Sequence, residues 1–306
     1  MDNFVEPFAG SLAVLLARPS GHKRRAETIN DADKFLANFW RALQAAPEEV
    51  ARWADYPVVE TDLHARHAWL VQIGMKQLEK LDADPDFYDA KIAGWWLWGI
   101  NSWIGSGWCS GNGPWKVVDG QLTKIGSNGV NRQLPHLGNA GRGINRKLPH
   151  LGNAGRGINR QLPHILLDYM YALSNRLRKV RVCCGDWSRI VTDGALSYGS
   201  SIGIFLDPPY SDDRRMQNLY NEDSNTLSKY VREWAIQHGD NQRFRIVLAG
   251  YEDEHEMPNS WRIHAYSANR SYGSNKNPTS QNNENRHKER LWFSPYCLNP
   301  EPKLFQ

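Results

Sequence analysis

Short apolar runs alternate along the chain with amphipathic segments, which predicts strands separated by helices. The runs typical of strands cover residues 4–8, 26–29, 180–184, 202–206, 244–249, 261–266 and 289–293. The segments typical of helices cover residues 12–17, 33–45, 64–81, 166–177 and 227–238. This order predicts an α/β fold with a mostly parallel sheet, which would bind ligands outside the carboxyl ends of its strands.

A different pattern interrupts this alternation between residues 85 and 164. The segment opens with a tryptophan-rich stretch whose Trp95, Trp96 and Trp98 are expected in the core. It then becomes rich in glycine and repeats itself with a 14-residue period, since residues 131–138 recur at 145–152 and in part at 159–164. We therefore expect one domain formed by residues 1–84 and 165–306, and a second formed by the inserted residues 85–164.

The net charge of the chain is only +4 and does not by itself indicate a binding partner. The distribution of charge within the insert is more informative. From Gly120 to Leu167 there is no Asp or Glu, whereas the same segment holds seven Lys and Arg residues and three histidines. A surface without acidic side chains is typical of one that meets phosphates. The alternative interpretation is a duplicated, solvated loop that binds nothing.

Composition bears on two questions: whether the chain binds a metal, and in which cellular compartment it is expected. The four cysteines form no C-x-x-C pair and no histidine cluster has metal-ligand spacing, so a zinc site is not predicted. Residues 1–4 show no basic region followed by an apolar run, so we expect no signal peptide, and we expect no membrane span because no apolar stretch is long enough. We therefore expect a cytoplasmic protein of a bacterial or phage-infected cell.

The strongest chemical signal follows the run at 202–206, where the chain reads Asp207-Pro208-Pro209-Tyr210. A carboxylate and a backbone carbonyl that accept both N–H groups of an exocyclic amine would direct the nitrogen lone pair toward a methyl donor. Pro209 would fix the backbone, and Tyr210 would stack on a base turned out of the double helix. The alternative is a plain turn that ends a strand.

With this tetrapeptide, most of the chain resembles the Dam-type DNA adenine methyltransferases, whose order is cofactor motif, target-recognition insert, catalytic motif. The resemblance implies a Rossmann-like methyltransferase sheet with an inserted target-recognition domain, and S-adenosylmethionine as cofactor. The first cofactor motif would be Glu6, Pro7, Phe8, Ala9, Gly10 and Ser11. Gly10 would let the backbone approach the ligand, and the next helix would offer free N–H groups.

Two further motifs complete the cofactor pocket that the resemblance implies. In the second, which includes Thr28 and Ile29, an acidic residue accepts hydrogen bonds from the ribose hydroxyls. Glu27 is the first candidate for this acid and Asp31 the second, although Asp31 could equally cap the next helix. In the third, Asp186 would accept a hydrogen bond from the amino group of the cofactor's adenine, and Trp187 would pack on the face of that adenine ring. The alternative is a polar turn followed by a core tryptophan.

The resemblance also names the partner. It implies that the insert binds double-stranded DNA, that Asp207 contacts the cofactor as well as the amine, and that basic residues track phosphates or read base edges. These candidates are Arg132, His136, Arg142, Arg146, Lys147, His150, Arg156, Arg160, Arg214 and Arg215. Relatives usually carry a Pro-Gly-Ser/Gly-Lys-like turn before the first motif, and we find no such turn before Phe4 here. We expect either that the sequence begins after that turn or that another part of the protein supplies those cofactor contacts. A palindromic target would suit a homodimer.

The expected activity is therefore site-specific methylation of adenine N6 in duplex DNA, with or without a companion restriction enzyme. Cytosine N4 is the nearest alternative, because its exocyclic amine needs the same hydrogen-bond geometry. The initial Asp of the tetrapeptide and the motif order favour adenine. Protein-glutamine methylation is disfavoured, because enzymes of that kind usually have Asn at the first position of the tetrapeptide. A third alternative is a catalytically silent DNA-binding module with an incomplete cofactor pocket.

Overall fold

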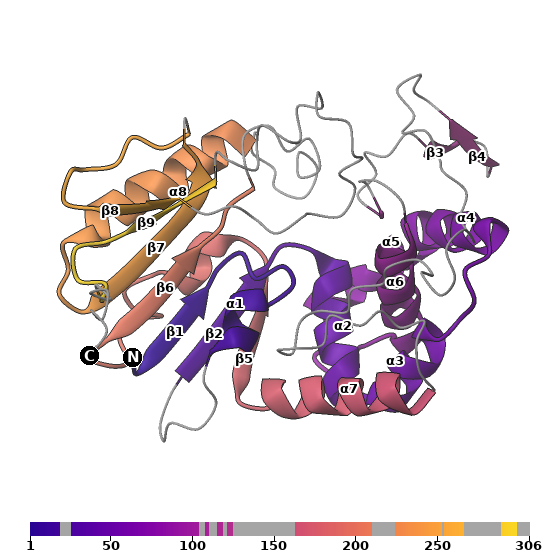
Figure 1. Cartoon of the computed structure of the whole chain (residues 1–306). Coiled ribbons are helices and arrows are strands. Elements are labelled where there is room, and N and C mark those ends of the chain that lie inside the picture. The colour runs from indigo at the N-terminus through magenta and orange to yellow at the C-terminus, as the bar shows by residue number, and fades with distance from the viewer. Residues whose placement is uncertain are drawn as a thin grey trace, which may run out of the picture.

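The chain folds as an α/β protein with a mostly parallel mixed sheet and helices on both faces, compatible with a Rossmann-like fold (Figure 1). The computed structural model describes residues 1–18, 26–103, 108–109, 115–118, 121–124, 163–209, 224–252, 254–265 and 289–298. None of the helices in these ranges is both long and apolar enough to cross a membrane.

Seven strands form the main sheet. They are β1 (Asn3–Glu6), β2 (Ala26–Asp31), β5 (Val180–Cys184), β6 (Ile202–Leu206), β7 (Phe244–Tyr251), β8 (Arg262–Ala265) and β9 (Glu289–Phe293). Their spatial order is β5-β2-β1-β6-β7-β9-β8. The first five strands in this order pair in parallel, and β9 runs antiparallel between β7 and β8. The parallel strands therefore present their carboxyl ends along one edge of the sheet.

The helical elements connect and cover these strands. They are α1 (Ala13–Ala17), α2 (Lys34–Ala45), α3 (Pro47–Ala54), α4 (Glu60–Trp69), η1 (Leu70–Gly74), α5 (Met75–Leu78), η2 (Glu79–Asp82), α6 (Ala90–Ser102), α7 (Pro163–Leu177), η4 (Trp187–Ile190) and α8 (Ser224–Gly239). Local capping explains several starts: the Asp33 carboxylate accepts from the Phe35 N–H at 2.8 Å, and Asp89 accepts from Ile92 N–H at 2.8 Å.

Both faces of the sheet are buried, as its central parallel strands require. Successive side chains of a strand point to opposite faces, and β1 shows this with Phe4 and Val5. Phe4 joins the hydrophobic core that α2, α3, α6 and α7 share, whereas Val5 joins the core beneath α8. Figure 1 shows α8 lying along β7, α1 beside β2, and helices α2 to α7 gathered beyond β5.

The tryptophan-rich stretch belongs to the first of these cores, as the sequence predicted. Trp96 and Trp98 on α6 are buried, and the Trp98 indole donates to the Tyr56 carbonyl at 2.8 Å. Helices α3 and α6 approach closely at Gly94, where a Cβ would lie 2.3 Å from the Cβ of Trp53. Residues 90–102 of the predicted insert thus share a core with β1 and α2.

A buried histidine lies inside this aromatic region. His67 on α4 is 3% exposed and its ring lies 4.9 Å from that of Trp103 and 5.2 Å from that of Trp108. Within the part of the chain that the structure describes, neither nitrogen of His67 has a hydrogen-bond partner. Burial lowers the pKa of His67 to about 4, with a further lowering from His64. The imidazole is therefore neutral at neutral pH.

Part of the segment that follows α6 in the chain is also described. Strands β3 (Trp115–Val118) and β4 (Gln121–Lys124) pair antiparallel as a two-stranded sheet separate from the main one. They lie within the predicted insert, whose repeats fall outside the described residues. The division of the chain into residues 1–84 with 165–306 and an inserted 85–164 remains a prediction.

Candidate active site

The strand order reverses between β1 and β6, which makes this part of the carboxyl edge a topological switch point, the position at which α/β sheets generally bind ligands in a crevice. From β1 the chain moves outward through β2 to β5, then returns to place β6 on the other side of β1. Parallel α/β sheets bind ligands at such a switch point, because the two following loops diverge there. The loops that meet here are residues 7–12, after β1, and residues 207–209, after β6.

Glu6, the last residue of β1, places a buried carboxyl at this switch point. Glu6 is 2% exposed, and its Oε2 has no hydrogen-bond partner among the described residues. Burial raises the pKa of Glu6 to about 8; a hydrogen bond with the Leu15 backbone and the charge of Arg18 oppose this rise, and Asp207 adds to it. Glu6 ends β1 and Asp207 directly follows β6, so the parallel pairing of these strands brings both residues to the same edge of the sheet.

The loop after β1 turns sharply at Gly10. Gly10 has φ of +45° and Leu12 has φ of 60°, a left-handed conformation that costs a non-glycine residue energy. The loop is held to β2 by two hydrogen bonds: Ala9 N–H donates to the Asn30 carbonyl at 2.9 Å, and Gly10 N–H to Asp31 Oδ2 at 2.9 Å. Gly10 and Ser11 are exposed, so their backbone is accessible at the crevice.

Asp31, at the carboxyl end of β2, organises the neighbouring turn. Its Oδ2 accepts from Gly10, and its Oδ1 accepts from the Asp33 N–H at 2.9 Å. The cap of α2 is Asp33 rather than Asp31. Burial raises the pKa of Asp31, and it raises that of Asp33 to about 7, with Asp31 contributing. Two interacting acidic groups therefore stand beside the Gly10 turn.

Asn30 ties the ends of three strands together. Its side-chain amide donates to the Pro7 carbonyl at 3.1 Å and to the Gly185 carbonyl at 2.9 Å. Pro7 follows β1, Asn30 lies in β2 and Gly185 follows β5, so one buried side chain fixes the ends of three strands relative to one another. The sequence pattern did not predict this bridge. A buried-strand pattern that ends on a polar residue was the available signal.

Glu27, the first candidate for the ribose-binding acid, does not lie with these residues. It occupies the second position of β2 and pairs in register with Phe4, toward the amino edge of the sheet. Both of its oxygens are engaged: Arg18 Nη1 lies 2.9 Å from Oε1, and Arg176 Nη1 lies 2.6 Å from Oε2. Asp31 is therefore the better-placed acid. Between them, Thr28 is half-buried and Ile29 packs in the core.

The third motif reaches the same edge after β5. The exposed Asp186 caps η4, since its carboxylate accepts from the N–H of Ser188 at 2.9 Å and from its hydroxyl. Trp187 is 6% exposed and stacks on Phe8 with 5.9 Å between ring centroids and an interplanar angle of 29°. Because Phe8 and Trp187 cover one another, both are core residues as well as neighbours of the crevice.

The tetrapeptide itself is described as far as Pro209. Strand β6 delivers it to the crevice, where Asp207 is exposed while Pro208 and Pro209 are buried. Buried prolines restrict the backbone here, so the Asp207 carboxylate and the Pro208 carbonyl have little freedom to move apart. Tyr210 lies outside the described residues.

The predicted DNA-binding residues also lie outside the described residues. They are Arg132, His136, Arg142, Arg146, Lys147, His150, Arg156, Arg160, Arg214 and Arg215. Within the described ranges, no group of three His, Cys, Asp or Glu side chains is arranged to hold a metal ion. The chemical resources described at the crevice are thus carboxyls and backbone groups.

Comparison with known proteins identifies no relative. The sequence matches no protein-family model and no curated protein. Function is therefore inferred from the residues that lie at the switch point.

Proposed function

We propose that this protein is an S-adenosylmethionine-dependent DNA methyltransferase that methylates the N6 amino group of adenine. The observation that supports the proposal most is the meeting of the Asp207-Pro208-Pro209 loop with the Glu6–Gly10 loop at the switch point. Residues suited to amine methylation (Asp207 and Pro208) and a turn suited to a bulky ligand (at Gly10) thus lie at the same switch point. A mostly parallel α/β sheet is the framework that the Dam-type resemblance implies.

The acidic groups of the crevice suit the cofactor. S-adenosylmethionine supplies a methyl group on a sulfonium cation, and it carries an ammonium and two ribose hydroxyls that donate hydrogen bonds. Glu6 offers a buried oxygen that no described residue hydrogen-bonds, and Asp31 stands beside the exposed Gly10 turn. A cationic donor near Glu6 would satisfy that oxygen and favour the ionised carboxylate. Asp186 and Trp187 follow β5 at the same edge of the sheet, and we propose that they contact the adenine ring of the cofactor.

Asp207 and Pro208 would act on the acceptor. The Asp207 carboxylate accepts one N–H of the exocyclic amine and the Pro208 carbonyl accepts the other, so the nitrogen lone pair points away from both toward the methyl donor. As nitrogen gains the methyl group it becomes positively charged, and the nearby carboxylate stabilises that charge until a proton leaves to solvent. Tyr210 would stack on the flipped base.

Double-stranded DNA as the substrate rests on the acid-free segment from Gly120 to Leu167. Its basic residues would contact phosphates, and some would read base edges. We propose that residues 85–164 supply target recognition within a Rossmann-like methyltransferase framework. Action as a homodimer in the cytoplasm is part of the same proposal, since a palindromic site would match two-fold symmetry.

The proposal is tested by Asp207→Ala, with the exposed Asp240→Ala as the matched control. Methyl transfer to duplex DNA should fall at least about 100-fold in Asp207→Ala, because a group that stabilises developing charge is lost. Asp240→Ala should retain full transfer, and calorimetry should show that Asp207→Ala still binds S-adenosylmethionine. Full activity of Asp207→Ala would overturn the proposed mechanism.

Two further readouts separate the alternatives. Mass spectrometry of nucleosides from treated DNA distinguishes N6-methyladenine from N4-methylcytosine, which needs the same contacts at Asp207. No binding of S-adenosylmethionine by the intact chain would instead indicate a silent DNA-binding module.

A further inference from the structure

Trp108 packs on α6 in a space that only a glycine leaves open. A Cβ at Gly99 would lie 1.7 Å from Cζ2 of the Trp108 indole and 2.2 Å from its Cε2. The Trp108 Nε1–H also donates to the Trp96 carbonyl of α6 at 3.0 Å. Trp108 is 8% exposed although α6 ends at Ser102, so the chain leaves this helix and then returns to it. We call the contacts of Trp108 with Gly99, Trp96 and His67 the Trp108 anchor.

Three residues at the Trp108 anchor are locally unfavourable choices. Gly99 lies inside α6, where glycine stabilises a helix less than alanine does. Cys109 is 4% exposed and has φ of 57°, a left-handed conformation that is strained for any residue other than glycine. The buried ring of His67 lies 5.2 Å from that of Trp108, and no described residue hydrogen-bonds its nitrogens. Each of these features costs stability, and all three occur next to one indole.

This combination indicates that the Trp108 anchor is retained for function rather than for stability. An alanine at position 99 and an aliphatic side chain at position 108 would occupy the same region without the helix-interior glycine. Proteins depart from favourable local choices mainly at functional or strained sites. A second indole reinforces the anchor, since the ring of Trp103 lies 5.3 Å from that of Trp108 and 4.9 Å from that of His67. The chain is thus fixed to α4 and α6 at two points.

The position of the anchor along the chain indicates which function it serves. Trp103 and Trp108 follow α6, and the chain continues through β3 and β4 toward the repeats at residues 131–164. The segment from Gly120 to Leu167, which contains no Asp or Glu, belongs to this stretch. Trp103 and Trp108 also share a hydrophobic core with Phe4 of β1, the strand that ends at the switch point. The two indoles therefore connect the acid-free segment to the domain that carries the candidate active site.

We propose that Trp108 is a positioning residue for DNA binding, because it holds the start of the DNA-binding segment against α6. This inference rests on the proposed function, since it takes the acid-free segment as the part that binds DNA. The anchor acts by pre-organisation. A segment that is already fixed at its start loses less conformational entropy when it binds a duplex, and its affinity is correspondingly higher.

The test is the double substitution Gly99→Ala with Trp108→Leu, which removes the indole and places aliphatic carbon in the space that it leaves. Fluorescence anisotropy with a fluorescein-labelled, mixed-sequence duplex should show binding at least about ten-fold weaker than that of the wild type, because the chain around residue 108 must now be ordered when DNA binds. Calorimetry should show an unchanged affinity for S-adenosylmethionine, because the substitutions leave Glu6, Gly10 and Asp31 in place.

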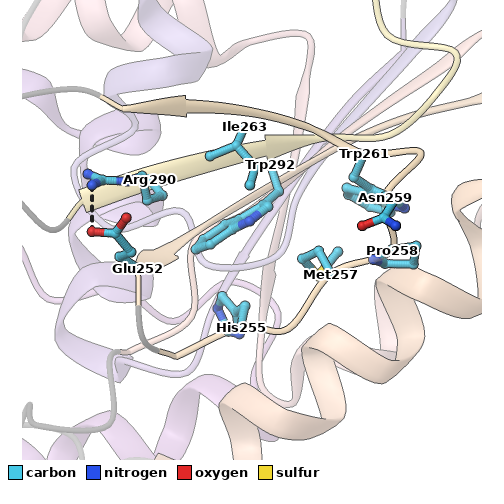
Figure 2. A pocket seen from close by; sticks show the side chains of 9 residues that line it. All are labelled: Glu252, His255, Met257, Pro258, Asn259, Trp261, Ile263, Arg290 and Trp292. Carbon is cyan, nitrogen blue, oxygen red and sulfur yellow. Dashed lines mark hydrogen bonds and ion pairs between the residues drawn. The ribbon is translucent and has the colours of Figure 1, made fainter.

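Gly239→Ala is the matched control, because it crowds an indole against a helix glycine elsewhere in the fold. A Cβ at Gly239, the last residue of α8, would lie 2.6 Å from Cζ2 of Trp261. Figure 2 shows Trp261 near Asn259 and Pro258, among the residues that line a cavity at β8 and β9. This region lies at the opposite edge of the sheet from α6 (Figure 1). The control should lower the melting temperature and leave DNA affinity unchanged.

The outcomes separate this inference from the proposed function. Wild-type DNA affinity in the folded double variant overturns the inference and leaves the proposed function standing. Duplex binding by the wild type without methyl transfer overturns the catalytic proposal alone, and no duplex binding by the wild type overturns both. If the double variant fails to fold, Trp108→Phe decides, because it keeps a ring against Gly99 but loses the hydrogen bond to Trp96. It should bind DNA more weakly, and an unchanged affinity overturns the inference.

Discussion

Replacement of Glu6 by Gln should change how the stability of the protein depends on pH. The amide has the shape of a protonated carboxyl, so its oxygen can keep the hydrogen bond with the Leu15 backbone while its NH₂ group occupies the place of the unpartnered Oε2. The variant therefore imitates the protonated form of Glu6 and removes its titration.

The magnitude follows from the raised pKa of Glu6. The pKa is about 8 in the folded chain against an ordinary value of 4.5, so the folded state binds more protons between these values. Stability from this group is fully present below pH 4.5 and is lost as the pH rises toward 8. Between pH 5.5 and 7.5 the loss amounts to about 2.5 kcal/mol, at 1.36 kcal/mol for each pKa unit.

Urea denaturation followed by circular dichroism at these two pH values measures the effect. The free energy of unfolding of Glu6→Gln minus that of the wild type should rise by about 2.5 kcal/mol from the lower to the higher pH. The exposed Glu256→Gln should show no such change. A difference between Glu6→Gln and wild type that stays constant across the two pH values would refute the assignment of Glu6 as a buried, protonated carboxyl.

Three other substitutions test the surrounding structure. The free energy of unfolding of the wild type should fall by about 3 kcal/mol from pH 7 to pH 4 on account of His67, because its depressed pKa makes the unfolded state bind more protons in that window. His67→Phe should abolish this part of the pH dependence, and denaturation at both pH values measures it. Gly99→Ala should destabilise the fold by about 3 kcal/mol in the same assay, since its Cβ would lie 1.7 Å from Cζ2 of Trp108. Asp31→Ala should weaken S-adenosylmethionine binding at least about ten-fold in calorimetry, whereas Glu27→Ala should leave the affinity unchanged; the reverse result would restore Glu27 as the ribose-binding acid.

Local sequence determined several elements of the fold. Strands β5, β6 and β9 begin and end where the apolar runs predicted, because each run is bounded by glycine or polar residues. The run predicted at residues 4–8 forms a strand only to Glu6, since Pro7 has no N–H to offer the ladder. The amphipathic segment predicted at 64–81 is helical throughout, but its middle turn is the π-helical η1, which periodicity alone does not reveal.

Long-range pairing limited what could be predicted at the site. Glu27 and Asp31 belong to the same sequence motif, and the motif alone does not say which of them lies at the site. The register of β2 against β1 places Asp31 at the carboxyl edge of the sheet and Glu27 beside Arg18 and Arg176. The proximity of Glu6 and Asp207 depends on the strand order, which local pattern does not encode. The ion pairs of Glu27 likewise join residues far apart in the chain.

The bridge made by Asn30 has a consequence for how this protein tolerates sequence variation. One amide donates to the loops that follow β1 and β5, so a substitution near Pro7 that shifts its carbonyl also strains the contact at Gly185. Mutations in these separate segments should therefore show epistasis, with effects that depend on one another rather than add. Natural or engineered variants are expected to change the two loops together, or to leave both as they are.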